Sequence, residues 1–260
     1  MEIVVCIKQV PDTAEVKVDP QTNTLIREGV PSVINPFDKY ALEAALQLRE
    51  RFGGKIKVIS MGPPQAEEAI QETYSLGIDE GYLLTDRAFA GADTLATAYT
   101  LATGIRKIGG FDLIICGKQA IDGDTAQVGP ELAELLSIPQ VAYVRKLEIL
   151  DGLLRVEREL EERAETIELL LPALITVTNQ IGELRSPSLK GVLKAKGREI
   201  ICWRAEDLEI DRGRIGLSGS ATRVVRIFTP PKREDREILK GDVKEVTTRL
   251  VQELKKRMII

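Results

Sequence analysis

A glycine-rich stretch at residues 117–129 holds the residue types best suited to ligand chemistry in this chain. It follows the apolar run 113–116, which is typical of a buried strand, and leads into a helical apolar pattern that starts at Val128. At the carboxyl end of a parallel strand, such a turn faces the ligand crevice, and its N–H groups suit a phosphate. The stretch is neither a Walker loop nor a G-x-G-x-x-G fingerprint. The pattern favours a nucleotide site, and the alternative is an ordinary polar turn of an α/β domain.

The chain has no histidine, and this restricts the chemistry open to its own side chains. Ser–His and Cys–His pairs, His-ligated zinc and a His proton shuttle are all excluded. The cysteines Cys6, Cys116 and Cys202 lie far apart, without paired or metal-ligand spacing. Any redox or group-transfer chemistry must therefore come from a bound organic cofactor. We assign no catalytic side chain and no metal ligand.

Composition places the chain among ordinary soluble proteins, with 43% hydrophobic and 29% charged residues. A net charge of −4 gives no nucleic-acid footprint. No apolar run approaches the length of a membrane span, and the N-terminus enters a strand without the features of a signal peptide. Unpaired cysteines fit a reducing compartment. We therefore expect a cytoplasmic protein that binds no nucleic acid and does not insert into a membrane.

Strands and helices must position the glycine-rich stretch, and they alternate up to about residue 136. Strands are expected at residues 3–10, 55–61, 82–84 and 111–116, with helices beginning at Asn35, Gln65 and Asp93. This alternation predicts a Rossmann-like, doubly wound, mostly parallel sheet. Asn35 and Asp93 precede their helices as favoured N-caps, and Asp38 lies in the first turn of its helix. On pattern alone, Asn35 and Asp38 are simply caps.

The pattern changes after Pro139. Alternating apolar residues on both sides of a turn at residues 151–152 predict added antiparallel strands, and residues 173–178 predict another buried strand. No compact core is visible from Gly182 onward, and the last predicted helix, at residues 233–256, has one apolar stripe. We expect a nucleotide-binding α/β domain at residues 1–182. Residues 183–260 then form a C-terminal arm that packs on this domain or on a partner subunit.

Several separated motifs, in this order, resemble the β subunit of electron-transfer flavoproteins, and the resemblance covers essentially the whole chain. The motifs are Asn35-Pro36-Phe37, Ser60-Met61-Gly62-Pro63, Lys118-Gln119-Ala120-Ile121-Asp122, the ribbon at 156–172, and Leu189 with Lys194-Ala195-Lys196. The resemblance implies a heterodimer with an α subunit that binds FAD, around which the C-terminal arm wraps. In the housekeeping branch, the β subunit holds a structural AMP. In the electron-bifurcating branch, it holds a second FAD, which accepts a hydride from NADH and splits the electron pair.

Two positions in the glycine-rich stretch distinguish these branches. The housekeeping pattern is similar to Asp-Asp-x-Asn-Gln-Thr-Gly, whereas this chain has Ala126 and Val128 at the Asn and Thr positions. Losing two polar partners weakens a site for a terminal phosphate. It also leaves room for a diphosphate, for which the helix start at Asp93, Thr94 and Thr97 offers a second N-terminus. The chain therefore resembles the bifurcating branch. An AMP-binding housekeeping carrier and a non-redox adenine-nucleotide module are the alternatives.

The resemblance also implies roles for individual residues. Leu189 matches an anchor that inserts into a partner dehydrogenase of the acyl-CoA or quinone-reducing type, the alternative being an ordinary loop leucine. Lys118 either pairs with phosphate or is a solvated charge. At the adenosine end we expect Cys6, Asn35, Asp38 and Met61; at the ribose and phosphates Gly117, Lys118, Gln119, Ala120, Asp122, Gly123, Asp124, Thr125, Ala126, Gln127 and Val128; and at the FAD diphosphate Asp93, Thr94 and Thr97.

Overall fold

The computed structural model describes residues 1–12, 31–150, 152–225 and 237–260. These residues divide into two units, Met1–Val225 and Arg226–Ile260. The first unit contains the sheet, its covering helices and the glycine-rich stretch, and the second contains one helix.

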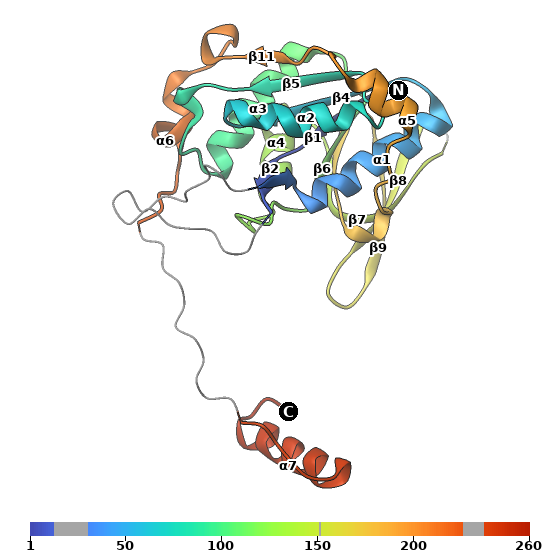
Figure 1. Cartoon of the computed structure of the whole chain (residues 1–260), viewed down its shortest axis with the longest axis vertical. Helices are drawn as coiled ribbons and strands as arrows, with labels where there is room; N and C mark the ends of the chain where they lie inside the picture. Colours follow the sequence, from blue (N-terminus) through green and yellow to red (C-terminus); the bar gives the residue numbers. More distant parts are fainter. Residues whose placement is uncertain (13–30, 151, 226–236) are drawn as a thin grey trace. The chain divides into compact units, whose positions relative to one another are not determined.

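The first unit is built on a nine-stranded sheet of order β11-β5-β4-β1-β6-β10-β7-β8-β9 (Figure 1). Neighbouring strands from β11 to β7 are parallel, and β8 runs antiparallel to both β7 and β9. A second, two-stranded sheet pairs β2 with β3. The strands are β1 Glu2–Cys6, β2 Gln9–Pro11, β3 Ser32–Ile34, β4 Lys55–Met61, β5 Glu80–Leu84, β6 Leu113–Gly117, β7 Gln140–Leu150, β8 Leu153–Glu159, β9 Ala164–Leu170, β10 Ala173–Val177 and β11 Ile201–Trp203. The predicted fold class is confirmed.

Helices cover both faces of this sheet. On one face lie α1 (Pro36–Phe52) and α2 (Glu67–Tyr74), with α5 (Leu189–Ala195) packed on α2. On the other lie α3 (Thr94–Ile108) and α4 (Val128–Leu136), which pack against each other. The remaining helical segments of this unit are η1 Pro64–Ala66, η2 Arg87–Phe89, η3 Asn179–Ile181, η4 Ala205–Asp207, η5 Arg212–Arg214 and α6 Gly216–Gly219. The sheet is therefore the middle of three layers.

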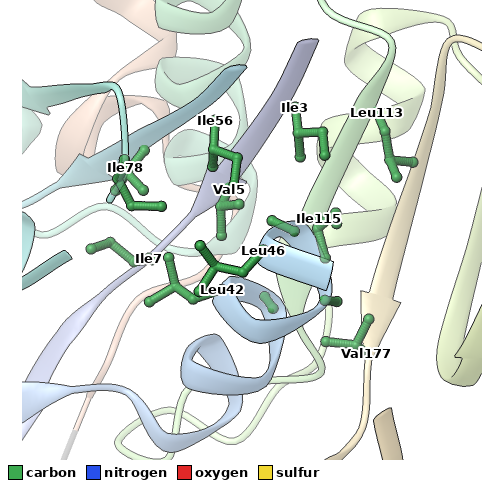
Figure 2. Close-up of a cluster of buried hydrophobic side chains, with 14 of the residues drawn as sticks. Ile3, Val5, Ile7, Leu42, Leu46, Ile56, Ile78, Leu113, Ile115 and Val177 are labelled. Atoms are coloured by element: carbon green, nitrogen blue, oxygen red, sulfur yellow. The ribbon is translucent and has the colours of Figure 1, made fainter. Parts of the chain in front are cut away.

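The core has two halves, one on each side of the sheet. Ile3 and Val5 of β1 pack into the half under α1 and α2, which Figure 2 shows together with Leu42 and Leu46 of α1. Val4, which alternates with them, belongs to the half under α3 and α4. Strands covered on both faces have continuous apolar sequences, which explains why the sequence predicted them.

The first strand is shorter than the predicted span of 3–10, because the chain leaves the main sheet after Cys6. Lys8 instead bonds to the start of α1: its carbonyl accepts from the Asn35 backbone N–H at 2.8 Å, and its own N–H donates to Asp38 Oδ2 at 2.7 Å. Residues Gln9–Pro11 then pair with Ser32–Ile34 as the second sheet. The apolar sequence pattern does not stop at Cys6, because the main sheet and the second sheet both bury apolar side chains.

The expectation that the chain has no packed structure after Gly182 is wrong. Strand β11 extends the main sheet beyond β5, and α5 packs on α2. Arg185 holds the intervening segment to α1 by donating to Glu43, which is 5% exposed, at 2.8 Å. The division at residue 183 therefore stays a prediction about which residues contact a partner subunit.

The second unit contains α7 (Val243–Lys256), whose first turn is capped by the Asp242 carboxylate. The predicted start at residue 233 was too early: residues 237–242 are not helical, and 233–236 lie outside the described residues. The apolar stripe has no buried member; Val243 is 85% exposed. No helix in the described parts of the chain has both the length and the apolar character needed to cross a membrane.

Candidate nucleotide-binding site

The glycine-rich stretch lies where the strand order of the sheet reverses. From β1 the chain proceeds to β4 and β5 on one side, then returns through α3 to β6 on the other side of β1. The connections after β1 and β6 therefore leave the sheet in different directions, and in open α/β sheets this arrangement places the ligand site at the carboxyl ends of these strands. Cys6 and Cys116, near those ends, are register partners and are both buried. The binding loop, which we define as residues 117–127, follows β6 at this point.

The binding loop has an unusual backbone. Asp124 and Ala126 have φ values of 54° and 56°, in the left-handed region that residues other than glycine seldom occupy. Such conformations concentrate at ligand sites and belong to the N–H concavities that bind anions. Most residues from Ile121 to Gln127 are exposed, so the loop is open to a ligand.

Asn35 occupies the N-cap position of α1, as predicted, but its side chain makes no capping bond, which corrects the interpretation of this side chain as a simple cap. Its Nδ2 instead donates to the Gln119 carbonyl at 2.8 Å and to Asp38 Oδ1 at 2.9 Å. Its Oδ1 accepts from the Ile121 N–H at 3.1 Å. Asn35 is fully buried, and it fastens the binding loop to the start of α1.

Asp38 extends this connection to the segment after β1. Its Oδ2 accepts from the Lys8 N–H at 2.7 Å, while Lys8 Nζ reaches Asp122 of the binding loop at 2.6 Å. Burial raises the pKa of Asp38 to about 7, against the opposing effect of hydrogen bonds from Asn35, Lys8 and Gly117. Three chain segments therefore converge on one buried carboxyl group.

Gly117 has no room for a side chain, because a Cβ there would lie 2.3 Å from Asp38 Oδ1 and 2.6 Å from the Phe37 carbonyl carbon. We expect Gly117→Ala to destabilise the protein by about 1–3 kcal/mol through overpacking and to reduce nucleotide content. Gly123→Ala is the matched control, since nothing lies within 4 Å of its added methyl group. Urea unfolding and nucleotide release measure both effects; equal stability of the two variants would contradict the prediction.

The start of α3 lies beside α4. Asp93 caps α3 as predicted, accepting from the Ala96 N–H at 3.0 Å, and its other oxygen holds Thr222 at 2.8 Å. Thr94 Oγ1 donates to Glu131 Oε1, in the first turn of α4, at 3.1 Å. The N-termini of two helices are thus adjacent, and each favours an anion.

The second carboxylate oxygen of Glu131 is also unusual. Its Oε2 is buried, with no hydrogen-bond partner among the described residues. Burial raises the pKa of Glu131, as does the Asp93 charge, although the Thr94 hydroxyl lowers it. A buried orphan acceptor needs an explanation, and a ligand hydroxyl, such as those of a ribose or ribityl chain, would satisfy it. The residues present therefore fit a bound nucleotide.

Tyr143 and Lys118 form a further contact beside the binding loop. Lys118 Nζ lies 5.3 Å from the centroid of the Tyr143 ring, and Tyr143 has a left-handed φ of 62°. The Tyr143 N–H donates to Thr176 Oγ1 at 3.0 Å. Sequence reasoning missed Lys8, Glu131 and Tyr143. Of these three residues, only Glu131 had a signal in the sequence, as the acidic residue in the first turn of α4. Backbone strain and long-range ion pairs leave no local sequence pattern.

The structure links many of the predicted site residues. Asn35 and Asp38 bond to each other and to the binding loop, Thr94 adjoins α4, and Met61 ends β4 on the same sheet edge as Cys6. Leu189 belongs to a different place, the first residue of α5. It is 79% exposed, beside Leu193 at 61%. Two exposed leucines on one short helix are an unusual surface feature.

The comparisons with known proteins decide the family. The protein-family model described as "Electron transfer flavoprotein domain" matches residues 22–208. An electron transfer flavoprotein subunit beta from Thermoanaerobacterium thermosaccharolyticum is 54% identical, with all of both chains covered. This chain belongs to the electron transfer flavoprotein β-subunit family.

Other relatives extend the comparison. The caffeyl-CoA reductase-Etf complex subunit CarD of Acetobacterium woodii is 48% identical, with all of both chains covered. Protein FixA of Bradyrhizobium diazoefficiens is 48% identical over 92% of this chain and 86% of its own. Electron transfer flavoprotein β subunits pair with an α subunit and carry electrons in complexes that bind a flavin. The resemblance seen in the sequence motifs is thereby confirmed.

Proposed function

We propose that this β subunit holds an FAD in the crevice above β1 and β6 and takes part in NADH-dependent electron bifurcation with a partner dehydrogenase. One observation carries the FAD assignment: the Thr94–Glu131 hydrogen bond, which makes the N-termini of α3 and α4 neighbours. AMP has one phosphate, whereas FAD needs a site for two. The binding loop and the start of α3 together supply N–H groups for two phosphates.

The side chains around the end of the binding loop support the same assignment. Ala126 of the binding loop and Val128, the first residue of α4, offer no side-chain hydrogen bond to a terminal phosphate, so a ligand that ends at this phosphate is held poorly. Lys118 adds a positive charge after β6. When bound, FAD supplies the redox chemistry. The contribution of the chain is to bind the phosphates, orient the cofactor and accept the ligand hydroxyls.

A housekeeping role with AMP is the second candidate, and Glu131 favours it. A carboxylate beside Thr94 opposes a second phosphate at the start of α3 through charge repulsion. Burial raises the pKa of Glu131, which weakens this opposition. Measuring the flavin and AMP content of the heterodimer separates the two candidates.

The partner assignments rest on exposed apolar surface. The stripe of α7 includes Leu250, which is 47% exposed, and an α subunit is the occupant that the family implies for the arm at residues 183–260. The name of the CarD relative includes a CoA-ester reductase, which supports an acyl-CoA-type dehydrogenase as the electron-transfer partner. We propose that Leu189 anchors that dehydrogenase.

Leu189→Ala is expected to lower electron transfer to the dehydrogenase while leaving the flavin spectrum unchanged. Truncation of a central interface anchor costs about 2 kcal/mol or more, which corresponds to about 30-fold in affinity. Leu217→Ala is the control, since Leu217 is also an exposed leucine, 48% accessible, on α6. Equal transfer rates for the two variants would identify Leu189 as an ordinary surface leucine.

A further inference from the structure

We propose that Asn35 and Asp38 form a positioning pair, whose side chains fix the conformation of the binding loop. The proposal rests on the nucleotide site described above. Asn35 is 0% exposed and Asp38 is 6% exposed, so both side chains are enclosed by the chain. Their hydrogen bonds go to the chain itself, at Lys8, Gln119 and Ile121.

The orientation of the Asn35 amide is fixed by two backbone groups of the binding loop. The Gln119 carbonyl can only accept and the Ile121 N–H can only donate, so Nδ2 must face the first and Oδ1 the second. With this orientation, Nδ2 also faces Asp38 Oδ1. Asn35 therefore holds the peptide groups on either side of Ala120 in one conformation.

Asp38 is consequently surrounded by donors. Asn35 Nδ2, the Lys8 N–H and the Gly117 N–H all donate to its carboxylate. A protonated carboxyl group would turn its O–H toward one of these donors and lose that hydrogen bond. The ionised form of Asp38 is thus the one that holds the segment after β1, the start of α1 and the binding loop together.

Other charged groups around Asp38 leave this dependence intact. Lys8 Nζ, on the segment after β1, is paired with Asp122 of the binding loop. Cys116, on β6, has its pKa raised by its hydrogen bond to Cys6, by burial and by the nearby charge of Asp38, so it stays a neutral thiol. Asp38 is then the group in this cluster that changes charge near neutral pH.

The pH dependence follows from the raised pKa of Asp38, about 7 in the folded chain against an ordinary 3.8. As the pH falls through about 7, the folded chain takes up a proton there, so the loop loosens and nucleotide affinity falls. The free energy of unfolding changes in the opposite direction, because the folded chain binds this proton more tightly than the unfolded chain does. The stabilisation from this proton is fully present below about pH 4 and is lost as the pH rises through about 7.

The test uses the purified heterodimer carrying Asp38→Asn, with FAD and AMP as separate binding probes. We expect this variant to lose about tenfold or more in nucleotide affinity and to show no change in affinity between about pH 6 and pH 8. The control is Glu43→Gln. Glu43 is equally buried on the same helix, but it bonds to Arg185 and not to the loop. It should lose stability in urea while keeping wild-type affinity and its pH profile.

A second variant keeps the test decisive if Asp38→Asn does not fold. Asn35→Ser removes the amide that reaches the loop but leaves the Asp38 carboxyl group, so affinity should fall while its pH dependence is retained. Proportional losses of affinity and stability in all variants, Glu43→Gln included, would overturn the positioning role. A wild-type heterodimer that binds AMP alone would refute the FAD assignment, and the positioning role would still be tested with AMP.

Discussion

Replacing Ala126 by Asn and Val128 by Thr together is expected to exchange bound FAD for AMP. Each new side chain offers a hydrogen bond to a charged phosphate, at about 1.5–3 kcal/mol per bond. Two such bonds favour a ligand that ends at that phosphate by about 3–6 kcal/mol, which is about a hundredfold or more in affinity. The backbone accepts Asn, because Ala126 has a φ of 56° and Asn is enriched in this region.

Nucleotide content of the purified double variant measures this exchange. Ala126→Gly is the matched control, since it relieves the left-handed backbone without adding a polar group, and it should retain FAD. Unchanged FAD stoichiometry in the double variant would mean that these two positions do not select the ligand.

Thr94→Val is expected to weaken FAD binding by about tenfold or more while leaving AMP binding nearly unchanged. The substitution removes the hydroxyl that joins α3 to Glu131, so Glu131 Oε1 loses its partner and, among the described residues, neither oxygen of this carboxylate is then hydrogen-bonded. An unsatisfied group of this kind costs about 1–3 kcal/mol, and the repelling charge stands where the second phosphate is expected.

Thr100→Val provides the comparison for Thr94→Val on the same helix. Thr100 is fully buried, and its hydroxyl donates to the Ala96 carbonyl within α3 at 2.8 Å. It should affect stability alone. Titration of both variants with FAD and with AMP gives the four affinities needed. A loss of AMP affinity equal to that of FAD in Thr94→Val would place Thr94 outside the diphosphate site.

The fold followed from the sequence wherever local patterns determine it. The strands of the parallel sheet are covered on both faces, so their apolar runs are continuous, and Asp93 capped α3 as its position indicated. The break after Cys6 and the added strand β11 were missed. Both depend on pairing between distant segments, Gln9–Pro11 with Ser32–Ile34 and Ile201–Trp203 with β5.

The candidate site was predictable as a location but not as a network. Strand-to-helix patterns identified the loop after β6, and the resemblance to a family supplied its residues. The bonds that shape it join Asn35 to Gln119, 84 residues apart, and Lys8 to Asp122, 114 residues apart. No local pattern encodes such pairs. For the same reason Asn35 looked like a helix cap, since its partners in the loop lie far along the chain.

The measurement that tests the central claim most directly is the FAD and AMP content of the purified heterodimer, by acid release and chromatography. Our account predicts two FAD per heterodimer and no AMP, one flavin in the α subunit and one in this chain. One FAD with one AMP would contradict it, because the crevice above β1 and β6 would then hold a structural nucleotide and the redox chemistry would lie wholly in the α subunit.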